Sequence, residues 1–408
     1  MSSQKFKPFY AVLILFFAVL FFFVLFFSHY PQELKEYAKT DAVLGTVCRV
    51  RLLTEKPEKE AHEILNSVFT ELFRLESLFN ANSDIQHTNQ YEISELEKVN
   101  RLAGIEPVEV SEELYSLVKT SIFFAEKTDG AFNPAIGPLV KLWNIGFNEA
   151  ETAYPDKQNG DVELIPSKEK IEAVLPLLDY RDIILSENGS QHKTIFLRKK
   201  GMRLDLGGIA KGYAADKAAL LIVSAGIKNA LIDLGGNISV IGKNPSNKNW
   251  KIGIKNPNLG KNNSIMNMEV TDRSLVTSGN YERYFIREGI LYHHILDSKT
   301  GYPVKNDLNA VSILCKKSVY ADVLSTACFV LGREKSQRLL NELEKPEYEA
   351  EAFFFFKDNT VSHLSDLKTK ISNLKLPIRN LKKTLFNFCI FQKFLKFRHG
   401  EFEDKNQR

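Results

Sequence analysis

Apolar side chains recur at every third or fourth position in several stretches of the chain, and this spacing predicts amphipathic helices. In residues 57–79, for example, Ile64, Val68 and Leu72 share one face of a helix. A helix near the middle of the chain ends at Gly226, a residue suited to a helix C-terminus. The predicted helices cover residues 57–79, 112–127, 166–178, 214–223, 319–331 and 335–343.

Between these helices, short apolar or alternating runs bounded by glycine, asparagine and aspartate predict β-strands. Helices and strands follow one another without a regular alternation, which favours the α+β class. The predicted strands cover residues 42–53, 180–185, 194–197, 203–206, 230–234, 238–241, 250–254, 267–270, 274–279, 281–286, 291–297, 310–315 and 350–356.

The N-terminal region contains an apolar run over residues 9–27, long enough to cross a bilayer as one helix. A signal peptide is the alternative, but no clear small-residue cleavage site follows the run. Lys5 and Lys7 precede the run, so its N-terminal flank belongs in the cytoplasm. We therefore expect residues 1–36 to be a membrane anchor or signal sequence, with the remaining chain outside, in a periplasm if the source is a bacterium.

The last segment, residues 363–408, differs from the rest because lysine and arginine recur among phenylalanine and leucine. Its apolar residues have helical spacing, although Pro377 interrupts the run. A basic amphipathic segment can lie on an anionic membrane. The alternative is an extension that packs against the domain or is poorly ordered.

Neither the net charge nor the cysteine spacing indicates a particular partner or a metal site. A net charge of +4 over 408 residues is small, so charge gives no indication of a nucleic-acid partner. Cys48, Cys315, Cys328 and Cys389 are widely spaced, and no pair has the spacing of a metal site. We expect them to be small buried hydrophobic side chains.

Residues 203–216 read as the end of a strand, a glycine turn and the start of a helix. Gly207 and Gly208 permit a sharp turn that leaves backbone N–H groups uncovered, and Lys211 follows on the helix. Such a helix N-terminus suits a phosphate or pyrophosphate. The alternative is a plain turn with a solvated lysine, and the spacing matches neither a Walker loop nor a Rossmann fingerprint.

Two further groups could carry chemistry. Asp322 and Thr326 are four residues apart, so they share one helical face and could offer oxygen ligands to Mg²⁺; a helix cap is the plainer alternative. His294 could accept a proton from an attacking hydroxyl, although it could equally be an ordinary histidine. Thr277 lies in a run of hydroxyls beside a glycine, which is useful for phosphate but common in turns.

Taken in order, these motifs resemble those of the ApbE family, the FAD:protein FMN transferases. The resemblance extends over roughly residues 40–360 and implies a single large ApbE-like, T-fold-related domain, which we place at residues 37–362, behind an N-terminal transmembrane helix. The motifs that carry it are residues 44–46, 131–134, 205–216, 234–237, 277–284, 294–297, 300–303 and 322–326.

The resemblance also implies roles for individual residues. Metal binding would fall to the Gly208 carbonyl, the Asp322 carboxylate and the Thr326 hydroxyl. His294 or Asp297 would be the catalytic base. The residues implied to contact FAD are Leu44, Phe79, Ala131, Phe132, Asn133, Asp205, Lys211, Thr277 and Ile295.

Members of this family cleave FAD, attach FMN through a phosphoester to a Thr or Ser of a partner protein, and release AMP, usually with Mg²⁺. The partner is typically a subunit of a membrane redox complex facing the periplasm. The expected location is therefore the bacterial cytoplasmic membrane, with the catalytic domain on the periplasmic side. Two alternatives stay open: an Mg²⁺-dependent FAD pyrophosphatase that yields free FMN and AMP, and a non-catalytic flavin-binding membrane protein.

Overall fold

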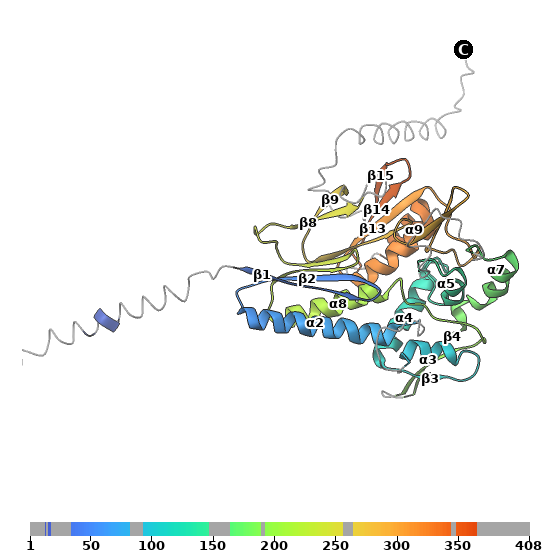
Figure 1. Cartoon of the computed structure of the whole chain (residues 1–408), viewed down its shortest axis with the longest axis horizontal. Helices are drawn as coiled ribbons and strands as arrows, with labels where there is room; N and C mark the ends of the chain where they lie inside the picture. Colours follow the sequence, from blue (N-terminus) through green and yellow to red (C-terminus); the bar gives the residue numbers. More distant parts are fainter. Residues whose placement is uncertain are drawn as a thin grey trace, which may run out of the picture.

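The computed structural model describes residues 34–81, 93–146, 164–188, 192–255, 264–343 and 348–364, together with residues 13 and 15–17. Its centre is an eight-stranded antiparallel sheet of order β1-β2-β6-β7-β10-β13-β14-β15 (Figure 1). These strands are β1 (Lys35–Val43), β2 (Thr46–Thr54), β6 (Asn229–Leu234), β7 (Asn237–Ile241), β10 (Arg273–Gly279), β13 (Leu308–Cys315), β14 (Glu351–Phe356) and β15 (Val361–Leu364).

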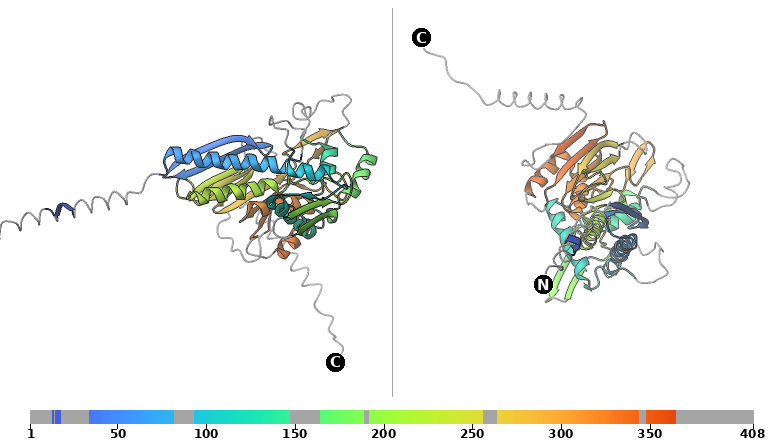
Figure 2. Two further views of the ribbon diagram at one scale, coloured as in Figure 1. Left: turned by 90° about the horizontal axis from the view of Figure 1, so that it is seen from below. Right: turned by 90° about the vertical axis from the view of Figure 1, so that its left-hand side faces the viewer.

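Helices cover one face of this sheet, and a two-stranded hairpin covers the other (Figure 1). On the helical face lie α2 (Glu58–Phe79), α8 (Ala210–Ser224) and α9 (Ser318–Glu342), and α2 and α8 run side by side (Figure 2). β8 (Trp250–Lys255) and β9 (Ser264–Val270) form the hairpin on the opposite face. The site described below lies where these layers meet.

Two hydrophobic cores follow from the alternation of side chains along the strands. Val276 and Val311 belong to the core beneath the helices, whereas their neighbours Leu275 and Ala310 pack beneath the hairpin. Trp250 of β8 is buried in this second core. Because both faces of the sheet are covered, its central strands are apolar on both sides.

A second group of elements packs beside the helical layer and includes a three-stranded sheet of order β3-β5-β4. β11 (Tyr284–Arg287) and β12 (Ile290–His293) form a separate hairpin. The elements of the second group are α3 (Glu95–Arg101), β3 (Val108–Glu109), α4 (Glu112–Lys127), α5 (Gly137–Trp143), α7 (Lys168–Val174), β4 (Ile183–Asn188), β5 (His192–Leu197) and the 3₁₀ turns η1 (Leu175–Leu177) and η2 (Tyr180–Asp182).

The single strand predicted over residues 42–53 is wrong, because the structure has a hairpin there. Val43 pairs with Thr46 across a two-residue turn of Leu44 and Gly45, whose φ angles are 57° and 67°. Two consecutive positive φ angles are typical of a tight hairpin turn that matches strand twist. β1 was missed because its charged residues stand on an exposed edge strand and leave no apolar alternation.

Among the residues that the structure describes, no helix is long and apolar enough to cross a membrane. The predicted span at residues 9–27 lies outside them, except at positions 13 and 15–17, which are helical. The basic segment lies outside them from residue 365 onward. The membrane anchor therefore stays a prediction, and the alternatives for the basic segment stay open. Secondary structure runs from Lys35 to Leu364, slightly beyond the predicted domain limits.

Candidate active site

A cavity of about 850 Å³ opens at one end of the large sheet. Its walls come from the turns between β1 and β2 and between β6 and β7, from β10, and from the first turn of α8. All of the predicted site residues except Asp297 line this cavity: Leu44, Phe79, Ala131, Phe132, Asn133, Asp205, Gly208, Lys211, Thr277, His294, Ile295, Asp322 and Thr326. The fold therefore brings together residues that are widely separated in the sequence.

The segment before the glycine turn is held in place by a side chain. Residues 203–206, predicted as a strand, have no regular secondary structure and pair with no strand in the described part of the chain. Instead the Asn100 amide donates to the Leu204 carbonyl (3.1 Å), and its oxygen accepts from the Leu204 N–H (2.6 Å). Asp205 then accepts from the Gly207 N–H (2.8 Å), which fixes the turn at the cavity wall.

The first turn of α8 touches α9 directly at Gly212. A Cβ atom on Gly212 would lie only 2.4 Å from the Ser318 carbonyl oxygen, so a larger residue does not fit. The close approach lets the Gly212 N–H donate to Asp322 Oδ2 (2.8 Å). Burial raises the pKa of Asp322, while the charge of Lys211 and this hydrogen bond act in the opposite direction.

Hydroxyl groups gather beside Asp322. Ser278 Oγ lies 2.7 Å from Ser325 Oγ and 3.2 Å from Thr326 Oγ1. A Cβ atom on Gly208 would lie 3.5 Å from Thr326 Oγ1, so the glycine turn is adjacent to this hydroxyl. Carboxylate, hydroxyl and carbonyl oxygens are hard ligands, and these residues therefore fit Mg²⁺.

In the described ranges, no group of three or more His, Cys, Asp and Glu side chains could hold a metal ion. Mg²⁺ is usually held by one or two carboxylates together with substrate phosphates and water, so a single buried aspartate suffices.

His294 stands where β12 has ended, because the predicted strand over 291–297 stops at His293. His294 Nδ1 lies 3.2 Å from the Arg283 carbonyl oxygen. A carbonyl only accepts, so Nδ1 carries the hydrogen and Nε2 carries the lone pair. Burial and the nearby Arg283 charge lower the pKa of His294 to about 3, which keeps the ring neutral. Ile295 and Leu296 both line the cavity, so these neighbours do not point to opposite faces as they would in a strand.

Asp297, the other predicted base, does not line the cavity. Its Oδ1 accepts from the Lys299 N–H (2.8 Å), and its own N–H donates to the Tyr302 carbonyl (2.9 Å). These bonds close the turn that follows His294. The structure therefore gives Asp297 a role in shaping the turn and leaves His294 as the candidate base.

A family model described as the ApbE family matches residues 44–354, a region that includes every residue lining the cavity. The chain belongs to the ApbE family.

Relatives and solved structures agree with this membership. The FAD:protein FMN transferase of Treponema pallidum is 40% identical over 339 residues, which are 80% of this chain and 86% of the relative. That of Klebsiella pneumoniae is 35% identical over 301 residues, covering 74% and 87%. The crystal structure of the ApbE protein from Thermotoga maritima has a TM-score of 0.66 at 31% identity, covering 80% of this chain and 96% of that one. The expected ApbE-like mixed α/β domain is thus confirmed.

Apolar surfaces form part of the cavity of this ApbE-family chain. Phe79 packs edge-on against Tyr213, with ring centroids 5.7 Å apart. Phe132 is buried, and a Cβ atom on Gly208 would lie 3.2 Å from its ring. Leu44 sits in the left-handed region at the tip of the first hairpin, an uncommon position for leucine that is consistent with a functional constraint. Flat apolar walls of this kind suit an aromatic ring system.

Two residues predicted to contact FAD have side chains that are engaged within the protein. The Asn133 amide donates to the Leu178 carbonyl (2.7 Å), and its oxygen accepts from the Ala135 N–H (2.9 Å). Thr277 Oγ1 lies 2.6 Å from Ser312 Oγ on β13. These hydrogen bonds hold the cavity wall in place, so Asn133 and Thr277 have a structural role whether or not they also contact a ligand.

Sequence reasoning assigned no role to several residues that line the cavity. Arg283 lies inside a motif that we recognised, so its position could have been noted. Glu76 and Lys255 belong to an ordinary helix and an ordinary strand, which give no local signal. Asn237 is buried, its Oδ1 accepts from Ser318 Oγ (2.7 Å), and its Nδ2 has no partner among the described residues. Asn237, like Arg283, lies inside a motif named above, whereas only tertiary packing brings Glu76 and Lys255 to the cavity.

Proposed function

We propose that this chain is an Mg²⁺-dependent FAD:protein FMN transferase. It would cleave FAD, attach FMN through a phosphoester to a Thr or Ser of a partner protein, and release AMP. The relatives reported above carry this activity in their names. The observation that supports it most is the grouping of Asp322, Thr326 and Lys211 on the wall of one cavity. About 850 Å³ lies in the usual range for small-molecule and cofactor sites, about 300–1,000 Å³.

Positive charge at the phosphates is the main requirement of this reaction, because phosphoryl transfer depends on position and electrostatics. Asp322, Thr326 and the Gly208 carbonyl would hold Mg²⁺, which when bound offsets the charge that develops on the AMP leaving group. Lys211 adds a fixed positive charge at the same wall. The N-terminus of α8 points its partial positive charge into this region.

The proton of the acceptor hydroxyl needs a base. In the proposed step, the hydroxyl oxygen forms a bond to the phosphorus of the FMN half, and the bond from that phosphorus to the AMP oxygen breaks. His294 Nε2 takes the proton, because the neutral ring has its lone pair there. Bound phosphates bring negative charge next to the ring and raise its pKa, which improves it as a base.

The proposal also includes a cellular location and an acceptor protein. Residues 9–27 anchor the chain in a bacterial cytoplasmic membrane, with the catalytic domain on the periplasmic side. The acceptor is a subunit of a membrane redox complex that presents its Thr or Ser on that side. The apolar run and the lysines before it support this arrangement.

The test uses the full chain with FAD, Mg²⁺ and a candidate redox subunit that carries an acceptor Thr. We expect the intact mass of the subunit to rise by that of an FMN group, with equal release of AMP. Asp322→Asn keeps the side-chain shape but removes the charge. We expect it to lower the rate by roughly a hundredfold or more, because even outer partners of metal ligands contribute about 10–100-fold. Asp272→Asn, at an exposed aspartate, is the matched control.

Three other results of this experiment would contradict part of the proposal. Free FMN and AMP without an adduct, on every acceptor offered, would favour the FAD pyrophosphatase. FAD recovered intact would favour a flavin-binding protein without catalysis. An Asp322→Asn variant as active as the control would contradict the proposed metal site while leaving the transferase in place.

A further inference from the structure

The large sheet has a second end, opposite the cavity, which we call the distal end: it is where β1 begins at Lys35 and β15 ends at Leu364. Strand pairing links these two residues across the whole sheet through the pairs Lys35–Thr54, Leu53–Asn229, Ala230–Ile241, Val240–Arg273, Ser274–Cys315, Leu314–Glu351 and Ala352–Leu364. The chain therefore continues at this end into the predicted anchor, residues 9–27, and into the basic segment, which could lie on a membrane or pack against the domain.

α8 also ends at the distal end, and it exposes an apolar patch there. The patch consists of Leu220, Leu221 and Val223, whose exposed fractions are 61%, 38% and 53%. The helix stops just before Gly226, where a Cβ atom would lie 4.0 Å from Lys56, two residues beyond β2. Single exposed apolar residues are ordinary, but three within four positions, at the end of the sheet where β1 begins, call for an explanation.

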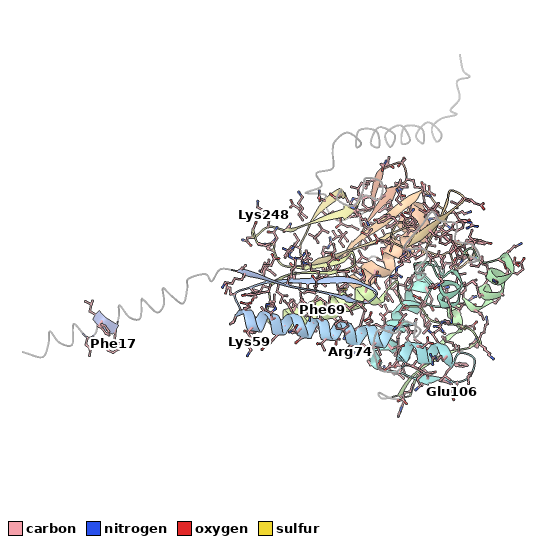
Figure 3. The ribbon with its side chains drawn as sticks, in the orientation of Figure 1. Phe17, Lys59, Phe69, Arg74, Glu106 and Lys248 are labelled. Carbon is pink, nitrogen blue, oxygen red and sulfur yellow. The ribbon has the colours of Figure 1, made fainter. Side chains whose placement is uncertain are left out.

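Charged residues also lie at this end of the sheet. Figure 3 shows Lys59 and Lys248 on the side where β1 begins. Lys228, between α8 and β6, is also exposed. Glu55 and Glu58 are exposed there as well, so the surface is mixed in charge and the apolar patch is its distinguishing feature.

We propose that the distal end rests on the surface of the bilayer, with the apolar patch in the headgroup region. This proposal depends on the membrane anchor proposed above, and it adds a fixed orientation of the domain. Residues 28–34 alone separate the apolar run from β1. An extended chain covers at most about 3.5 Å per residue, so Lys35 stays within about 25 Å of the membrane. Exposed leucine and valine, with lysine nearby, have the chemistry of a surface that binds lipid headgroups and acyl chains.

This orientation would set the height of the active site. α8 runs from the cavity at Lys211 to the patch, and its 15 residues at about 1.5 Å each span about 22 Å. α2 runs beside it in the opposite sense, from the distal end to Phe79 at the cavity. The cavity would then stand about 20 Å above the lipid surface, at a level where subunits of a membrane complex can present a side chain.

Depth-dependent fluorescence quenching tests the orientation in the full chain. Cys389→Ser removes the cysteine outside the described residues, and the three others are buried. Val223→Cys then carries an environment-sensitive fluorophore in vesicles of equal parts phosphatidylglycerol and phosphatidylethanolamine. We expect its emission to shift to the blue and to be mostly lost when the acyl chains carry a nitroxide quencher.

The matched control is Ile105→Cys, because Ile105 is 65% exposed and precedes Glu106, which lies far from the distal end (Figure 3). We expect its emission to be the same with and without the quencher. Equal responses of the two labels in chains that float with the vesicles would overturn the orientation and leave the anchor intact. Chains that do not float would overturn the orientation and the anchor together, while the transferase test above would be unaffected.

Discussion

Burial shifts the pKa values of two ionisable groups that line the cavity. It raises the pKa of Asp322 and lowers the pKa of His294 to about 3. Both shifts come from desolvation, which penalises the charged form of a group. Lys211 adds positive charge beside Asp322, and the Gly212 N–H supports the carboxylate. The site is therefore suited to a bound cation together with an anionic pyrophosphate.

The low pKa of His294 makes a specific prediction about pH dependence. A base is active in its neutral form, and with a pKa of about 3 the free chain keeps that form from pH 5 to pH 8. We expect kcat/KM for FAD to show no acid limb near pH 6.5, the ordinary histidine pKa. His294→Gln should lower kcat by roughly 10²–10⁴-fold with little change in KM, the usual range for loss of a positioned base. An acid limb near pH 6.5 that disappears in His294→Gln would contradict the lowered pKa of His294.

Sequence patterns predicted which single residues could carry chemistry, but they did not predict what surrounds those residues. Asp322 and Thr326 were found from their helical spacing, because α9 is regular where they lie. Asp297 shows the limit of such patterns, because a carboxylate in a turn can bond to a nearby N–H as readily as it can face a substrate. Asn237 was not assigned, since its cavity position depends on a contact with Ser318, far away in the sequence.

At the scale of elements, the joint between α8 and α9 positions the proposed metal ligands. Asp216 of α8 accepts from the Ser318 N–H (2.8 Å) and the Val319 N–H (3.0 Å), and it thereby caps the first turn of α9. Gly212 lies one turn earlier and permits the helices to touch. Because Asp322 follows on the same helix, the cap also fixes Asp322 relative to the glycine turn.

The same cap predicts how stability depends on pH. Burial raises the pKa of Asp216 to about 6, above its ordinary value of about 3.9. Between these values the folded chain holds a proton that the unfolded chain releases. The free energy of unfolding therefore falls as pH rises through this window, by about 3 kcal/mol at most. Asp216→Asn cannot titrate, so denaturant unfolding from pH 4 to pH 7 should show wild type losing stability relative to the variant. Parallel curves for the two would contradict the raised pKa.

Helices were predicted more accurately than strands, for a physical reason. Both ends of the helix Glu112–Lys127 were predicted correctly, because its apolar spacing, its cap at Ser111 and its stop before Asp129 are local. β1 was missed because an exposed edge strand has no buried face. Residues 203–206 look like a strand, yet Asn100 replaces the partner strand, and such a contact leaves no trace in the local pattern.

At the scale of the whole molecule, the two ends of the large sheet have different proposed environments: substrate at one end and the membrane at the other. The cavity lies at one end, and both chain exits lie at the other. The order of the strands could not be predicted from sequence, because β2 pairs with β6 and β10 pairs with β13 across long stretches of chain. The resemblance to a family implied the domain, whereas only the paired strands reveal that β1 begins and β15 ends at the same end of the sheet.

The direction of insertion follows from charge, because lysines before a membrane span stay in the cytoplasm. Lys5 and Lys7 precede the apolar run, so the domain should face the periplasm when the full chain is expressed in a Gram-negative host. Protease added to spheroplasts should remove the domain while a cytoplasmic marker survives. Replacing both lysines by glutamate should reduce the exposed fraction, since it removes the charges that set the direction. Protection of the wild-type domain equal to that of the marker would place it inside, where it could not reach an acceptor on the outer face.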